Sequence, residues 1–236
     1  MKKLLLLLPL ALLGLYLTFL PPLNTAIYDH QVTVILNQWE QQTGRSMDDT
    51  GAHPLPDALF PELLQDMADY NIFLSEHQQE GLTSPEVFEK TPLQLSDYGL
   101  EDDTPIATLT IEAIELQLPV YLGATDEHMS KGAAVLGQTS LPIGGESTNC
   151  VIAGHRGYRG IPYFRHLDRL QEGDEVILSN LWEDLHYRVV SVSIIQPNDL
   201  EAISIQEGED LLTLLTCHPY TVGTQRLIIL CKRVKT

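Results

Sequence analysis

The sequence contains few basic residues. Lys and Arg together number 14 against 32 Asp and Glu, so the formal net charge of the 236-residue chain is −18 at pH 7. A protein of this charge repels the phosphate backbone of nucleic acids. We therefore expect no nucleic-acid partner, and we interpret the acidic surplus as a solvated surface.

Cysteine is scarce, and the common cofactor motifs are missing. Three cysteines cannot form a disulfide framework, and their odd number leaves at least one thiol free. The chain has no CxxC or HExxH motif, and the adjacent Cys217 and His218 cannot comfortably bind one metal ion. The pair Gly144-Gly145 belongs to no phosphate-binding loop. We therefore expect no metal and no other cofactor.

Only one long apolar run occurs, over residues 4–20, directly after two lysines. Its length is at the short end of what spans a bilayer. A cleaved signal peptide is the alternative, but the run meets Pro21-Pro22 without a small-residue cleavage site. The pattern favours an uncleaved signal anchor over residues 1–24, with the positive charges holding the N-terminus in the cytoplasm. We expect a single-pass protein of the cell membrane whose catalytic part is extracellular.

Composition divides the rest of the chain into three parts. Residues 25–43 and 57–80 carry apolar side chains at helical spacing, which predicts a helical arm over residues 25–80. Residues 81–104 are polar without a clear period and are interpreted as a linker. From residue 105 to 236 the chain changes to short β-type runs separated by turn residues.

These runs predict a mainly β fold, a closed or nearly closed barrel of eight strands with short helices. One short helix is expected around residues 162–170. Seven predicted strands cover residues 106–114, 118–122, 148–155, 174–180, 185–195, 210–216 and 224–233, and residues 132–137 are the candidate for the eighth.

Cys217 is the best candidate for a nucleophile. It follows a strand and precedes His218-Pro219, where the proline prevents a central strand from continuing. A strand end holds a side chain rigidly and still leaves it accessible at the rim of a barrel. Cys150 and Cys231 lie inside apolar runs, where cysteine behaves as a small hydrophobic residue, so we interpret both as structural.

A nucleophilic thiol needs a base or a positive charge beside it. His155 also lies at a strand end, on the strand face opposite Cys150, which favours it as the base. Arg226 follows Cys217 by nine residues across a turn with Gly223, so a hairpin would bring it beside the thiol as an oxyanion donor. A hydrogen-bonded surface histidine, and an arginine paired with one of the many acids, are the alternatives.

The sequence TLLTC at residues 213–217 resembles the TLxTC signature of sortases, with Arg226 at the expected distance after it. Similarity to class C sortases, the pilin-polymerising branch, extends over roughly residues 105–233. The segments that carry it are residues 120–124 (VYLGA), 141–145 (LPIGG), 151–156 (VIAGHR) and 163–168 (YFRHLD). The resemblance implies an eight-stranded sortase β-barrel on the outer face of a bacterial membrane, most often that of a Gram-positive cell.

The resemblance also implies a reaction. A sortase cleaves an LPxTG-like sorting signal between Thr and Gly through a thioacyl enzyme, which an amine then resolves. In class C that amine is a pilin lysine, whereas other branches use a cell-wall precursor amine. The expected partners are pilin or surface proteins bearing the signal. The resemblance implies that Cys217 is the nucleophile and that His155 acts as general acid and then as general base. It also implies that Arg226 is the oxyanion donor and that the Thr216 hydroxyl contacts the substrate.

Class C sortases commonly carry a lid with an Asp-Pro-aromatic motif before the barrel. The corresponding segment here contains Ser84, Pro85, Glu86 and Phe88, so serine replaces the aspartate and the aromatic residue comes later. We expect Phe88 to lie over the thiol and Glu86 to face Arg226. A different class of function stays open as well, a non-catalytic, membrane-tethered binding module in which the three reactive residues are structural.

Overall fold

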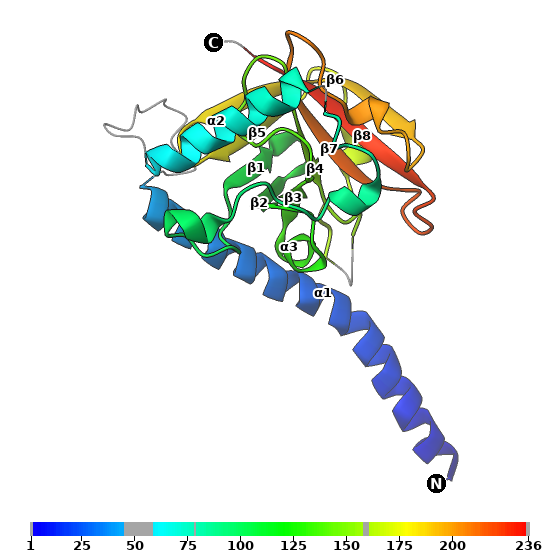
Figure 1. The fold of residues 1–236 in the computed structure, drawn as a ribbon. Coiled ribbons are helices and arrows are strands. Elements are labelled where there is room, and N and C mark those ends of the chain that lie inside the picture. The colour runs from blue at the N-terminus through cyan, green and yellow to red at the C-terminus, as the bar shows by residue number, and fades with distance from the viewer. Residues whose placement is uncertain (1, 45–58, 78, 158–160, 235–236) are drawn as a thin grey trace.

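The computed structural model describes residues 2–44, 59–77, 79–157 and 161–234, and its centre is a closed β-barrel (Figure 1). The strand order around the barrel is β1-β2-β3-β4-β7-β8-β6-β5. All eight runs predicted from the sequence are strands. Their bounds are β1 Ala107–Ile111, β2 Leu116–Leu122, β3 Ala133–Val135, β4 Thr148–Ala153, β5 Glu175–Asn180, β6 Asp184–Ile195, β7 Asp210–His218 and β8 Gln225–Arg233.

The strand β4 is buried along its whole length because both of its faces are covered. Cys150 and Ile152 face the main core inside the barrel. Val151 and Ala153 alternate with them and belong to a second apolar cluster on the other face of the sheet. His155 follows Ala153 by two residues, so it lies on the same face as Val151 and Ala153. The structure therefore agrees with the expectation that His155 and Cys150 lie on opposite faces.

Two longer helices lie outside the barrel, α1 Lys2–Thr43 and α2 Pro61–Glu76 (Figure 1). One face of α1 packs against the barrel, and the far N-terminal part of the helix extends away from it. The contact uses buried side chains three to four residues apart, which form one stripe on a helix. They are Tyr28, Val32, Leu36 and Trp39.

The helix α2 falls within the predicted range 57–80. The helix α1 begins well before the predicted range 25–43, so the boundary predicted at residue 24 lies inside it. Within the described residues, no helix combines the length and the apolarity that crossing a bilayer requires. Most of the loop expected between the helices, residues 43–56, lies outside the described residues. The division of the chain into anchor, arm, linker and barrel stays a prediction.

The remaining helices are short. The α-helix α3 spans Asp126–Lys131, and five 3-10 helices occur. The helix expected around residues 162–170 is reduced to one 3-10 turn, because the chain extends again at Leu170 and ends it. The 3-10 helices are η1 Pro85–Val87, η2 Leu95–Tyr98, η3 Glu112–Ile114, η4 Leu167–Arg169 and η5 Glu201–Ile203.

Candidate active site

Cys217 and Arg226 face each other across the hairpin of β7 and β8. The two strands pair antiparallel, and Cys217 lies directly opposite Arg226 in the register. Side chains opposite each other in such a pair lie on the same face with Cβ atoms about 4.5–5.5 Å apart. The thiol is exposed to solvent. The hairpin inferred from the sequence is therefore confirmed, and it places a guanidinium beside an accessible thiol.

His155 reaches the same place from β4, which runs parallel to β7. The next residue after β4, Gly154, donates its N–H to the Leu215 carbonyl at 3.1 Å, so the two chains stay paired to the residue before His155. His155, Cys217 and Arg226 all line one cavity of about 230 Å³. The structure thus brings together the three reactive residues predicted from the sequence.

The surroundings of His155 hold the imidazole in place. The ring of Tyr163 lies edge-on to it with centroids 5.7 Å apart, and Tyr28 of α1 packs edge-on behind Tyr163 at 5.0 Å. Both phenols donate to backbone carbonyls in the last turn of α3. Burial lowers the pKa of His155, and the nearby Asp126 carboxylate opposes this only in part. The environment therefore favours a neutral imidazole, which is the form that accepts a proton.

Arg226 is fixed by the backbone of its own hairpin. Its Nη1 donates to the carbonyls of Gly223 at 2.9 Å and of Gln225 at 3.0 Å. In the described part of the chain its other N–H groups have no protein acceptor, and no carboxylate pairs with it. This is unlike the paired surface arginine considered as the alternative, and it leaves donors of the guanidinium available at the cavity.

The other two thiols are unreactive because they are buried. Cys150 and Cys231 are 2% and 0% exposed. Burial raises the pKa of both, that of Cys231 to about 12. Because a buried thiol with a raised pKa forms almost no thiolate near neutral pH, these residues fill the core, as the apolar runs around them predicted.

Thr216 has a structural contact beside the predicted substrate contact. Its side chain is 1% exposed, and its hydroxyl donates to the Gly154 carbonyl at 2.8 Å. Successive residues of a strand point to opposite faces, so an accessible Cys217 leaves its neighbour facing inward. The hydroxyl therefore ties β7 to the chain before His155. Thr216 also lines the cavity at Cys217, and its contact with the substrate stays a prediction.

Part of the segment expected to form a lid lies at the cavity. Phe88 is half-buried in the second apolar cluster and lines the cavity with Cys217. Its carbonyl accepts hydrogen bonds from the N–H groups of Ala124 and Gly137 at 3.0 and 2.9 Å. The segment is thus fastened to the barrel by its backbone, and Phe88 lies at the cavity that Cys217 also lines.

The acidic end of this segment does not meet Arg226. Glu86 is exposed, and a hydrogen bond from Ser84 lowers the pKa of its carboxyl group. This local bond turns the carboxylate toward its own 3-10 helix, so the expected pairing of Glu86 with Arg226 is absent among the described contacts. Pro85 begins that helix, where its missing N–H is not needed.

The sequence reasoning missed two parts of the site. The segment between β6 and β7 lines the cavity with Pro197, Leu200 and Ile203, and only their apolar character could have indicated this. Arg156, the neighbour of His155, is buried and donates to the carbonyl of Cys217. Its position next to the histidine was the only available signal.

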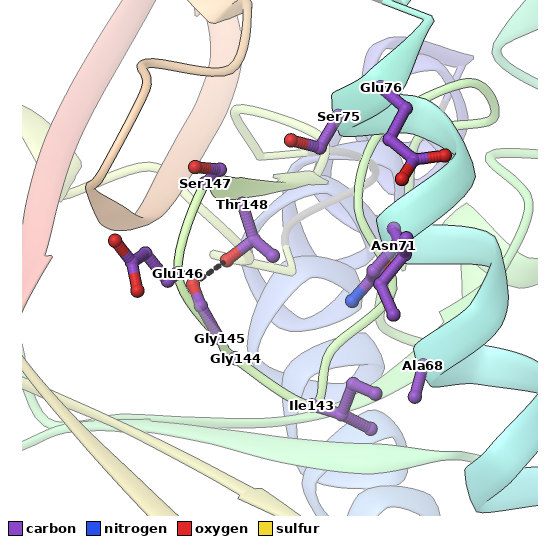
Figure 2. Close-up of a pocket in the computed structure, with 11 residues that line it drawn as sticks. Ala68, Asn71, Ser75, Glu76, Ile143, Gly144, Gly145, Glu146, Ser147 and Thr148 are labelled. Atoms are coloured by element: carbon purple, nitrogen blue, oxygen red, sulfur yellow. Dashed lines mark hydrogen bonds between the residues drawn. The ribbon is translucent and has the colours of Figure 1, made fainter.

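A larger cavity, of about 450 Å³, lies at the opposite end of β4 (Figure 2). Asn71, Ser75 and Glu76 line it from α2, and residues 143–148 close the other side. Its lining contains neither a thiol nor an imidazole. Because acyl transfer by a thiol needs both groups at one place, the smaller cavity at Cys217 is the candidate active site.

The chain is similar to known proteins in both sequence and fold. A family model described as the sortase domain matches residues 109–234. Sortase C1 of GBS Pilus Island 1 is 27% identical with a TM-score of 0.70, over 87% of this chain and 93% of its own. A Clostridium perfringens sortase C structure with the C-terminal cell wall sorting motif is 28% identical with a TM-score of 0.69, over 87% and 100%. Sortase A of Bacillus anthracis is 23% identical over 154 residues, 65% of this chain and 71% of its own.

A closed barrel with a thiol, an imidazole and a guanidinium at one cavity has the parts of an enzyme that transfers acyl groups through a cysteine. The family match extends over more than half of the chain. The chain belongs to the sortase family, whose members are cysteine transpeptidases acting on LPxTG-type sorting signals. Its neighbours among solved structures are class C sortases.

Proposed function

We propose that this protein is a class C sortase that cleaves an LPxTG-like sorting signal between Thr and Gly and transfers the acyl group to a pilin lysine. The observation that carries the proposal is the register of β7 and β8, which puts Arg226 opposite Cys217 at the cavity that also holds His155. Similarity to the pilus-island sortase and to the sortase C solved with a sorting motif supports this substrate class.

The first half of the reaction forms the thioacyl enzyme. The neutral imidazole of His155 takes the proton of the Cys217 thiol, and the sulfur attacks the carbonyl carbon of the signal threonine. The N–H groups of Arg226 that lack a protein acceptor stabilise the negative charge on the tetrahedral oxygen. As the C–N bond breaks, His155 gives its proton to the leaving glycine amine.

The second half resolves the thioacyl enzyme. A lysine amine attacks the thioester carbonyl, and His155 accepts the proton that this amine loses. The thiolate leaves, takes the proton back, and the product is an isopeptide bond between two proteins. The apolar wall of the cavity, including Phe88, favours this outcome because excluding water suppresses hydrolysis.

The proposal also states where the protein is located and what controls access to the Cys217 thiol. The apolar run at residues 4–20 would anchor the protein in the cell membrane with the barrel outside.

The segment around Phe88 would act as the lid over the Cys217 thiol. To test the lid, Phe88→Ala should speed alkylation of Cys217 several-fold, while the exposed neighbour variant Lys90→Ala should not change the rate. Equal rates in all three proteins would remove the lid from the account.

The experiment for the function offers an LPxTG-like peptide together with competing amines. A lysine peptide from a pilin and a glycine oligomer that stands for the cell-wall amine are mixed in equal amounts, and the products are identified by mass spectrometry. We expect the lysine product to dominate and Cys217→Ala to form none. A dominant glycine product would assign the protein to wall anchoring instead, and cleavage by Cys217→Ala would overturn the mechanism.

A further inference from the structure

Three contacts converge on the side chain of Arg156, the residue that follows His155. Its Nη1 donates to the carbonyl oxygen of Cys217 at 3.3 Å and lies 2.6 Å from Nδ1 of His218. Its Nη2 donates to Asp168 at 2.8 Å. Because a guanidinium has only donors, Nδ1 of His218 must be the acceptor. One side chain thus links the chain after β4, the end of β7 and the 3-10 helix η4.

The guanidinium is held in an environment that is unfavourable for a charge. The Arg156 side chain is 6% exposed, and its Nε has no partner in the described part of the chain. The paired Asp168 is 51% exposed, so most of the desolvation penalty falls on the arginine. A buried cation with one unmet donor is a costly way to hold two loops together, and apolar packing would do so at a smaller penalty.

The location of these contacts indicates what the arginine does. The backbone carrying the imidazole is joined, one residue further on, to the carbonyl of the residue carrying the thiol. The same guanidinium also donates a hydrogen bond to the ring of the next residue, His218. The peptide group between Cys217 and His218, together with the His218 ring, is therefore fixed relative to His155. Rates of proton transfer and attack depend strongly on such distances, with a misplacement of about 1 Å reducing rate by about 10².

We propose that Arg156 is a positioning residue that sets the distance between the Cys217 thiol and the His155 imidazole. The proposal rests on the proposed function, because it assigns the arginine to the same acyl transfer. Arg156 touches neither substrate nor reacting atoms in this role. It acts through the backbone of the nucleophile and through the chain next to the base.

The test compares variants of the full chain in cleavage of an LPxTG-like peptide. Arg156→Gln should reduce kcat by about 10²-fold and leave KM within about twofold, because alignment and not binding is lost. Arg156→Lys, which keeps the charge on a single donor nitrogen but loses the planar fork, should recover part of the rate. The matched control is Arg165→Gln, which removes an exposed arginine stacked on Tyr220 from the same loop and should keep the wild-type kcat.

A double-mutant cycle separates positioning from a merely structural role. If Arg156 acts by aligning His155 with Cys217, Arg156→Gln should reduce the rate far less in a His155→Ala background than in the wild type. A purely structural arginine would lower the rate by the same factor in both backgrounds. Equal factors, or a wild-type kcat in a folded Arg156→Gln variant, would overturn the proposal.

Alkylation of Cys217 by iodoacetamide keeps this test separate from the proposed function, since it needs no peptide. Arg156→Gln should slow alkylation several-fold at a fixed pH, because a thiolate reacts faster beside a well-placed base. A wild-type protein that does not cleave the peptide would refute the function, whereas unchanged alkylation in Arg156→Gln would refute the positioning. Urea unfolding of each variant confirms that a folded protein is measured.

Discussion

Replacing Gly154 by alanine should disturb both the barrel and the position of His155. A Cβ atom at this position would lie 2.8 Å from one carbon of the Phe164 ring and 3.0 Å from two others. The Phe164 ring is fully buried, so it has no free space into which to move. Overpacking of this kind typically costs about 1–3 kcal/mol of unfolding free energy.

The same clash should reach the active site through one hydrogen bond. The backbone N–H of Phe164 donates to the carbonyl of His155 at 2.9 Å, so a displaced ring also displaces the histidine. We expect kcat for sorting-signal cleavage to fall by about 10-fold to 10²-fold, in keeping with a shift of up to about 1 Å. Urea unfolding measures the loss of stability, and steady-state kinetics measures the loss of rate.

A second substitution tests the stated cause. Phe164→Leu alone should lower the unfolding free energy by about 1–2 kcal/mol through lost burial. Because leucine has no ring edge near Gly154, the double variant should be more stable than the sum of the two single effects predicts. Strictly additive losses, or a Gly154→Ala protein within about 0.5 kcal/mol of wild type, would refute the clash.

Three further predictions follow from the site. Arg226→Lys should lower kcat by about 10²–10³-fold, the usual loss of an oxyanion donor, and a change below about twofold would contradict this role. Iodoacetamide should label only Cys217 in the folded protein and all three cysteines in urea, as read by mass spectrometry; labelling of buried Cys150 or Cys231 in the native state would contradict the core assignment. Tyr28→Ala should lower the unfolding free energy by about 3 kcal/mol and Tyr28→Phe by about 1 kcal/mol, and equal losses would show that the ring does not pack.

The barrel could be predicted because its strands are short apolar runs separated by turn residues. Even the three-residue β3 was found, since alanine and valine lie there between two glycines. The helices were harder to delimit. The predicted anchor ends at residue 24, yet α1 continues past this boundary to Thr43 without a break at Pro21 or Pro22. Local sequence therefore indicated that these helices exist but not where α1 begins.

Cys217, His155 and Arg226 could be located because each stands at the end of a strand and the connection of two of them is a short hairpin. The contacts of Arg156 could not, since its acceptor on Cys217 lies 61 residues away in the sequence. The inward position of the Thr216 hydroxyl follows from strand alternation beside an exposed neighbour, and sequence reasoning had the means to predict it. The side chain of Glu86 was misplaced because a local bond from Ser84 competes with a distant arginine.

The most direct test of the account is to trap the covalent intermediate. The protein is mixed with an LPxTG-like peptide without an acceptor amine, quenched in acid and digested for mass spectrometry. We expect the acyl fragment ending in threonine as a thioester on Cys217, released by added lysine peptide. A fragment on another residue, or peptide cleavage that proceeds equally well in Cys217→Ala, would contradict it.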